Sequence, residues 1–215
     1  MPPMELRGPH LTLRLPEAAD APALLALAAD PEVTRWFSWG PYTSVEQPLA
    51  WIAAQEAERE AGIQLDWVVH DRDRGPVGVT GLGEMSARDR RAMVGTWLGR
   101  EHWGTGVNAE AKALVAHAAF TVLGLERIGA YSNPANVRSA GALERIGFTR
   151  EGTLRGWHRH GDRQLDVHVF GLLRTDWEHG PLAAIRATAI GRPPAPWMLG
   201  ETPAATLSRC GVSPS

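Results

Sequence analysis

Two glycines stand where a strand is expected to end and a helix to begin. Gly104 and Gly106 follow the strand-like segment 91–98 and precede segment 107–122, whose apolar residues recur at helical spacing. The first N–H groups of a helix have no partner within it and carry a partial positive charge, and glycine lets an anion approach the backbone closely. The spacing therefore predicts a phosphate-binding loop.

Two widespread phosphate-binding loops do not fit these residues. A dinucleotide-binding loop needs a third glycine and an acidic residue about 20 positions later, and a Walker A loop needs Gly-Lys-Ser/Thr. Neither pattern follows Gly106. The strand-like segments 65–70, 76–85 and 91–98 are separated by turn-forming residues, so we expect an antiparallel meander before the loop and not parallel βαβ units.

Other elements must position this loop. Further strands are predicted at 11–15, 127–131, 148–154 and 164–173, and helices at 17–29, 44–61, 107–122 and 136–146. An aromatic segment, 36–42, joins the first two helices, and the His- and Arg-rich stretch 155–163 is expected to connect the last two strands.

Composition limits the function classes. The 215 residues are 44% apolar and carry a net charge of −2, so we expect one full-sized domain and no nucleic-acid partner. The single cysteine, Cys210, excludes an internal disulfide framework, and no metal site is expected. No apolar run approaches the ~20 residues of a membrane span, and no signal core is visible, so we expect a cytoplasmic location. The Pro- and Ala-rich segment 178–215 is expected to be an extension that is at most partly ordered.

A second motif indicates a family. Asn136 and Ser139 precede a helix that ends in Gly147-Phe148, and Glu110-Ala111 closely follows the glycine loop. Together these features resemble the GCN5-related N-acetyltransferase (GNAT) superfamily, and more narrowly its RimJ/RimL type, over residues 10–177. The resemblance implies an α/β (α+β) fold. Its central sheet is expected to be mixed but mostly antiparallel, with about seven strands, flanked by helices and splayed between the fourth and fifth strands.

The resemblance also implies acetyl-CoA as the donor. In such folds the pantetheine arm lies in the gap between the splayed strands, and the pyrophosphate lies on the glycine loop. Two residues depart from the family pattern: Trp103 stands where Gln or Arg is frequent, and Asn108 stands where a small residue is usual. The cofactor-binding residues expected on this basis are Trp97, Leu98, Trp103, Gly104, Thr105, Gly106, Val107, Asn108, Ala109 and Asn136.

The resemblance implies one proton donor and leaves the base open. Ser139 matches the serine that would protonate the leaving thiolate, although it could also serve only the start of its helix. Relatives often carry a glutamate where this chain has Met93, so Glu84 on the preceding strand is our candidate base. A histidine near the last two strands, such as His158, or a water chain without an assigned base, remains an alternative.

The acceptor is expected to be a primary amine, either of a small molecule or of a peptide N-terminus. Trp36, Trp39, Tyr42 and His158 are the candidate substrate-binding residues, although the aromatic residues could equally pack in the core. Relatives are often homodimers, so a homodimer is one expectation for the assembly. Two alternatives remain open: a GNAT-fold transferase that uses another acyl donor such as aminoacyl-tRNA, and a non-catalytic CoA-binding module, which the missing strand glutamate motivates.

Overall fold

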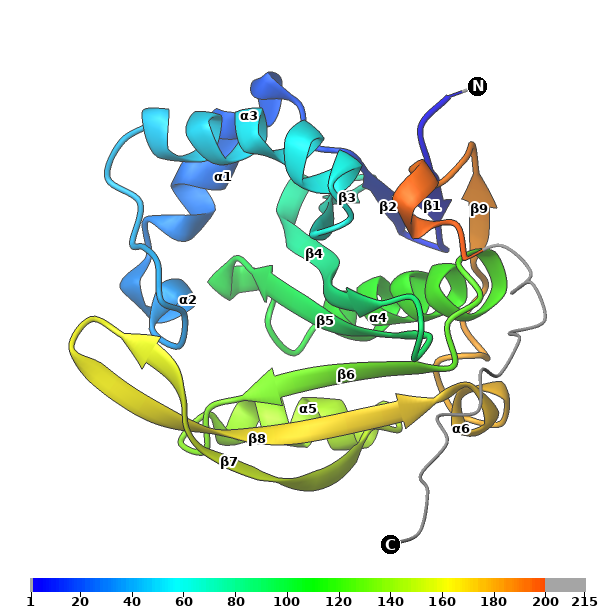
Figure 1. Ribbon diagram of the computed structural model, residues 1–215. Coiled ribbons are helices and arrows are strands. Elements are labelled where there is room, and N and C mark those ends of the chain that lie inside the picture. Colours follow the sequence, from blue (N-terminus) through cyan, green and yellow to red (C-terminus); the bar gives the residue numbers. More distant parts are fainter. Residues whose placement is uncertain (1, 200–215) are drawn as a thin grey trace, which may run out of the picture.

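Nine strands form one open sheet in the computed structural model, which describes residues 2–199 (Figure 1). The order across the sheet is β7-β8-β6-β5-β4-β3-β2-β1-β9, and neighbouring strands are antiparallel except for β5 and β6. The strands are β1 (Glu5–Arg7), β2 (Leu11–Arg14), β3 (Gln64–Asp71), β4 (Gly75–Ser86), β5 (Arg91–Leu98), β6 (Arg127–Ser132), β7 (Thr149–His160), β8 (Arg163–Leu173) and β9 (Thr188–Ile190).

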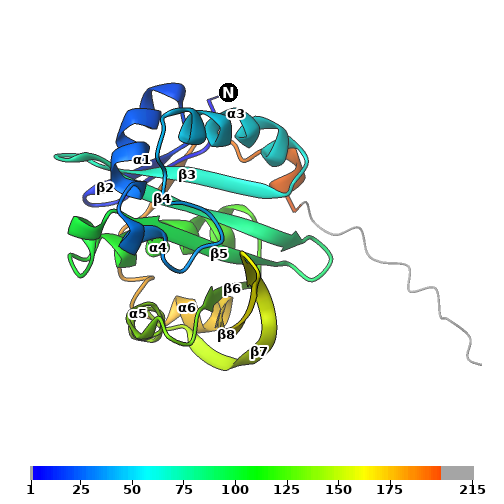
Figure 2. The same cartoon turned by 90° about the vertical axis from the view of Figure 1, so that its left-hand side faces the viewer.

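Helices cover both faces of this sheet (Figure 2). The helices are α1 (Ala21–Ala28), α2 (Pro31–Thr34), α3 (Glu46–Glu60), α4 (Val107–His117), α5 (Val137–Arg145) and α6 (Arg174–Glu178). Short 3-10 helices lie at Ala18–Asp20, Arg100–His102 and Ala195–Trp197, and a π-helical turn, Ala118–Val122, extends α4. None of the helices described between residues 2 and 199 has the length and apolar character needed to cross a membrane.

The two faces bury separate apolar clusters. On one face Leu24 of α1 packs with Val68 and Val79 of the sheet, against partly buried side chains of α3. On the other face α4 packs against the sheet, and the helical stripe read from the sequence is buried there, with Ala111 and Leu114 fully covered. Burial of this stripe orients α4, so its N-terminal end is held at a fixed place beside β5.

The parallel pair β5–β6 separates soon after it begins. Its register joins only residues 91–93 to residues 127–129, after which the two strands are no longer paired. Beyond Met93, therefore, β5 continues along β4 alone, and its other edge faces a gap. The mixed, mostly antiparallel sheet, splayed between the fourth and fifth of the strands expected from the sequence, is confirmed.

The structure differs from the sequence-based prediction at the edges of the sheet. The short strands β1 and β9 pair with each other and raise the number of strands from about seven to nine. Residues 155–163 were expected to be a connection, but most of them continue β7 and β8 into a long hairpin that turns near Gly161.

Part of the expected C-terminal extension packs onto the domain. Residues 188–190 form β9, and Trp197 is fully buried, with its Nε1 donating to the backbone carbonyl of Arg59 at 3.3 Å. Residues 200–215, including Cys210, lie outside the described part of the chain. The boundary at residue 177 stays a prediction.

Candidate active site

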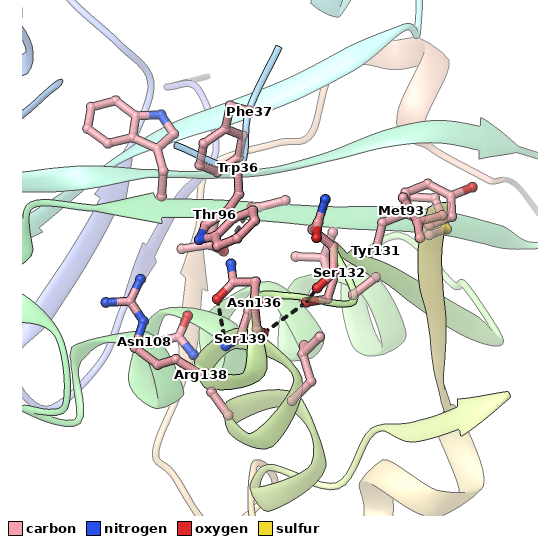
Figure 3. Close-up of a pocket in the computed structure, with 18 of the residues that line it drawn as sticks. Trp36, Phe37, Met93, Thr96, Asn108, Tyr131, Ser132, Asn136, Arg138 and Ser139 are labelled. Atoms are coloured by element: carbon pink, nitrogen blue, oxygen red, sulfur yellow. Dashed lines mark hydrogen bonds between the residues drawn. The ribbon is translucent and has the colours of Figure 1, made fainter. Parts of the chain in front are cut away.

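A cavity of about 850 Å³ lies where β5 and β6 diverge (Figure 3). Its walls come from β4, β5 and β6, the N-terminal ends of α4 and α5, the segment 36–39 and the hairpin of β7 and β8. The glycine loop, the Asn136–Ser139 turn and the aromatic segment, which are far apart in the sequence, therefore share one cavity.

The glycine loop forms an open turn at one end of the cavity. Gly104 has φ = 76° and Gly106 has φ = 93°, and a Cβ built on either residue would meet nothing within 4 Å. Gly106 is the N-cap of α4, so the helix starts at Val107 with its first N–H groups unpaired within it. Trp103 Nε1 donates to the carbonyl of Leu98 at 2.9 Å, which ties the loop to the end of β5. This geometry can hold an anion against the backbone.

A guanidinium lies beside that turn. Arg138 of α5 stacks over the ring of Trp103, 3.2 Å from its centroid, and both residues line the cavity. Partial burial lowers the pKa of Arg138 below its usual value, but arginine remains charged in proteins. The cation–π contact orients this charge next to the helix terminus, so the turn combines backbone N–H donors with a positive side chain.

The N-terminus of α5, next to Arg138, also lines the cavity. Asn136 is its N-cap, and its Oδ1 accepts a hydrogen bond from the backbone N–H of Ser139 at 3.2 Å (Figure 3). Ser132 Oγ donates to the carbonyl of Asn136 at 3.4 Å and links the turn to the end of β6. The side chain of Asn136 is thus used as a helix cap, which leaves the hydroxyl of Ser139 available on the cavity wall.

Glu84 and Tyr131 meet across the splayed strands. Tyr131 of β6 donates its hydroxyl to Glu84 Oε2 at 3.2 Å, and both residues line the cavity. Glu84 lies in an irregularity of β4 between Gly83 and Ser86 and has φ = 49°, a left-handed backbone that side chains rarely adopt. Burial and the neighbouring Glu84 raise the pKa of Tyr131, so its hydroxyl stays protonated at neutral pH. The pair places one carboxylate and one hydroxyl donor in the cavity.

Aromatic rings form the remaining wall. Trp39 packs edge-on against Trp97 with centroids 5.6 Å apart, and it also contacts Tyr42 at 5.2 Å. From the hairpin, the ring of His158 packs edge-on against Tyr131 at 5.2 Å. Burial, followed by the nearby His160, lowers the pKa of His158, so this imidazole is neutral at pH 7. The wall is therefore mostly apolar, with a neutral imidazole that can accept or donate a proton.

Comparison with known proteins identifies the family. A family model described as the acetyltransferase (GNAT) domain matches residues 10–149. An uncharacterised N-acetyltransferase of Bacillus licheniformis, p20, is 34% identical over 171 residues, which cover 78% of this chain and 95% of that relative. The chain belongs to the GNAT acetyltransferase family. It is accordingly an acyl-CoA-dependent transferase.

Solved GNAT structures share this fold. Mycobacterium smegmatis RimJ in complex with CoA-disulfide superposes with a TM-score of 0.74 at 23% identity and covers 83% of this chain and 90% of its own. Spermidine N-acetyltransferase from Vibrio cholerae in complex with CoA and spermine has a TM-score of 0.67 at 23% identity, and the match covers 78% of this chain and 98% of that one. At this level of identity the likeness shows the fold alone.

The residues of this GNAT domain fit a CoA donor. The turn at Gly104 and Gly106 faces open space, carries free N–H groups and lies beside Arg138, which suits a pyrophosphate. The unpaired edge of β5, at Trp97 and Leu98, offers backbone groups to an extended arm with amide groups. These residues would hold acetyl-CoA, whose thioester would supply the acetyl group.

The cavity contains most of the residues that the sequence suggested. Those that line it are Trp36, Trp39, Glu84, Trp97, Leu98, Trp103, Gly104, Gly106, Asn108, Ala109, Asn136, Ser139 and His158. Three do not line it. Tyr42 packs behind Trp39, Thr105 donates its hydroxyl to the carbonyl of His102 at 2.8 Å, and Val107 is buried in the core. The functional roles of all of these residues stay predictions.

Arg138, Tyr131 and Lys112 are among the cavity residues that were not predicted as site residues from the sequence. Arg138 lies between Asn136 and Ser139, so the motif itself could have indicated that this residue is near the site. Lys112 follows Asn108 by four positions, which places the two side chains on one helical face. Tyr131 lies near the end of β6, and nothing in its local sequence indicates a carboxylate partner 47 residues away.

Proposed function

We propose that this protein transfers the acetyl group of acetyl-CoA to a primary amine by direct attack, without a covalent acyl-enzyme. The observation that carries this proposal is the continuity of one cavity from the glycine turn of α4, past Ser139, to the Glu84–Tyr131 pair. Phosphate-binding groups, a hydroxyl donor and a carboxylate thus face the same space. This arrangement supports both donor binding and proton transfer.

The proposed reaction needs two proton transfers. The neutral amine nitrogen forms a bond to the thioester carbonyl carbon, the carbon–sulfur bond breaks, and the sulfur leaves as a thiolate. Glu84 takes the proton that the amine loses, and the hydroxyl of Ser139 donates a proton to the thiolate and is reprotonated by solvent. Ser139 N–H is capped by Asn136 at the start of α5, where the helix dipole favours developing negative charge.

The acceptor is proposed to be a small-molecule amine or a peptide N-terminus, as in the RimJ/RimL type. The aromatic wall at Trp36 and Trp39 supports an acceptor with an apolar or flat part next to its amine. Glu84, as the carboxylate on that side of the cavity, supports recognition of the incoming amine before it loses its proton. Spermidine N-acetyltransferase, which shares the fold, supports a small-molecule amine as one kind of acceptor.

The test is a thiol-release assay with acetyl-CoA against a panel of small amines and N-terminal peptides. Ser139→Ala is expected to lower kcat about 10²-fold or more on the best amine, the usual effect of losing a general acid, while KM for acetyl-CoA stays within about twofold. Ser44→Ala, which removes a hydroxyl outside the cavity, is the matched control and should behave as wild type.

Three other outcomes would contradict parts of the proposal. A Ser139→Ala enzyme with wild-type kcat would remove Ser139 as the acid and direct attention to the Tyr131 hydroxyl. Tight CoA binding with no thiol release from any amine would favour a non-catalytic CoA-binding module. Transfer supported by aminoacyl-tRNA and not by acetyl-CoA would replace the donor.

A further inference from the structure

Lys112 is the only lysine in the chain, and it is buried in the wall of the cavity. Its relative exposure is 5%, and its Nζ donates to Thr96 Oγ1 of β5 at 2.6 Å. Among residues 2–199 it has no carboxylate within ion-pair distance and no second hydrogen-bond acceptor. An ammonium has three donors, so two of them lack a protein partner here.

The threonines around Lys112 cannot accept hydrogen bonds from the two unpaired donors of its ammonium. Thr96 Oγ1 also lies 2.6 Å from Thr80 Oγ1 and donates to the carbonyl of Gly95 at 2.8 Å, so its hydroxyl is fully used. Burial lowers the pKa of Lys112 to about 7. If this position were only structural, leucine or methionine would give a more stable fold, because burying an amine with unpaired donors costs free energy.

Charged groups on the surrounding elements are engaged elsewhere or face other parts of the cavity. On the elements packed against α4, the ion pairs are Glu5–Arg7 on β1, Arg14–Asp20 from β2, and Asp89–Arg91 at β5. On α4 itself, Glu110 pairs with His10, and His117 lies within hydrogen-bond distance of Thr121. Glu84 of β4 binds Tyr131, and the α5 guanidinium of Arg138 stacks on Trp103. The protonation of Lys112 is therefore determined by its burial and by the ligand that occupies the cavity.

The position of Lys112 relative to the glycine turn points to its ligand. Asn108 and Lys112 lie four residues apart on the cavity face of α4, which is about 6 Å along the helix axis. Lys112 is thus one turn deeper than the groups that suit a pyrophosphate, and it lies against β5, whose free edge borders the gap. The part of CoA that follows the phosphates is the pantetheine arm, which carries amide carbonyl acceptors.

We propose that the ammonium of Lys112 donates to an amide carbonyl of the pantetheine arm, so that donor binding is coupled to protonation of this one lysine. The inference rests on the proposed use of acetyl-CoA. Binding would favour the charged amine and raise its pKa, so a proton is taken up with the donor. Below pH 7 the lysine is already charged; above pH 7 each binding event must draw a proton from solution, and affinity falls.

The first test measures affinity at pH 6 and pH 8 by calorimetry with dephospho-CoA. This probe lacks the 3′-phosphate monoester, whose second ionisation near pH 6 would overlap. With the lysine half-titrated at about pH 7, Kd for wild type should rise about 10-fold between these pH values if the bound ammonium stays charged. Lys112→Met, which keeps the volume, should bind more weakly at pH 6 and show no such rise.

His117→Gln is the matched control, because it removes another titratable group of α4 whose pKa is lowered by burial but which lies outside the cavity. It should keep the wild-type pH dependence. A second measurement needs no variant: with one lysine in the chain, a labelled lysine side chain gives a single NMR titration, whose midpoint should move upward when dephospho-CoA is added.

The two hypotheses fail in different ways. If wild type binds dephospho-CoA at neither pH, the proposed donor is wrong. If wild type binds it but Lys112→Met has the same pH dependence and the lysine midpoint does not move, Lys112 is a structural residue and the present inference is overturned while the proposed function stands.

Discussion

Gly104 offers the sharpest test of the proposed phosphate-binding turn, because the chain contains a matched glycine elsewhere. Gly104 has φ = 76° and Gly75, at the start of β4, has φ = 79°, and a Cβ on either would meet nothing within 4 Å. Only Gly104 lines the cavity. Alanine at each position should therefore introduce the same backbone strain and no clash, and the two variants should differ only in what the turn binds.

The expected magnitudes follow from that comparison. A left-handed alanine costs roughly 1–2 kcal/mol, and for a domain of this size each kcal/mol lowers Tm by about 2–4 °C. Both variants should thus lose about 2–8 °C in thermal unfolding. If the methyl of Gly104→Ala displaces a phosphate from one charge-assisted N–H bond, worth about 1.5–3 kcal/mol, Kd for CoA should rise about 10- to 150-fold.

Circular-dichroism melts and calorimetric titration with CoA measure the two effects on the same samples. Gly75→Ala should bind CoA as wild type does, despite its lower Tm. If Gly104→Ala binds CoA with the same Kd as Gly75→Ala, the turn is a structural corner and not a phosphate site.

Two further predictions concern Glu110 and the Glu84–Tyr131 pair. Glu110 Oε1 accepts from the backbone N–H groups of His10 and Leu11 at 2.7 Å each, so Glu110→Gln should lower the free energy of unfolding in urea by about 1.5–3 kcal/mol; a change under about 0.5 kcal/mol would mean that this contact does not hold β2 to α4. Tyr131→Phe removes the hydroxyl that donates to the Glu84 carboxylate, so kcat/KM for the amine should fall while KM for acetyl-CoA stays unchanged; an unchanged kcat/KM would exclude a role for this pair in proton transfer.

The strongly patterned elements were predictable from the sequence. The alternation and turns between residues 65 and 98 gave three antiparallel strands, and the apolar stripe of 107–122 gave α4, because burial of one face imposes a period on the residues. The strands β1 and β9 span only three residues each, too few for any period to appear. They exist because each completes the other's backbone hydrogen bonds at the sheet edge.

The long hairpin was missed for a related reason. Most residues of β7 are exposed on both faces, so the strand lacks the alternation of apolar and polar residues that a half-buried strand shows. Its length is set by pairing with β8, which continues to the turn after His160. The long hairpin also shapes the candidate active site, because it brings Trp157 and His158 against Tyr131.

The proposed donor and acceptor halves of the cavity differ in how much of them can be predicted from the sequence. The donor half depends on backbone geometry: a turn with φ between 76° and 93° needs glycine, and a helix start needs a capping residue such as Asn136, so both leave short motifs. The acceptor half is assembled from side chains of the segment 36–39, β4, β6 and the hairpin, which meet only in the fold. No local rule links Glu84 to Tyr131, since their contact depends on the β4 irregularity and on where β5 leaves β6. Substitutions in the acceptor half can therefore change the amine that is bound while the motifs that identify the family stay intact.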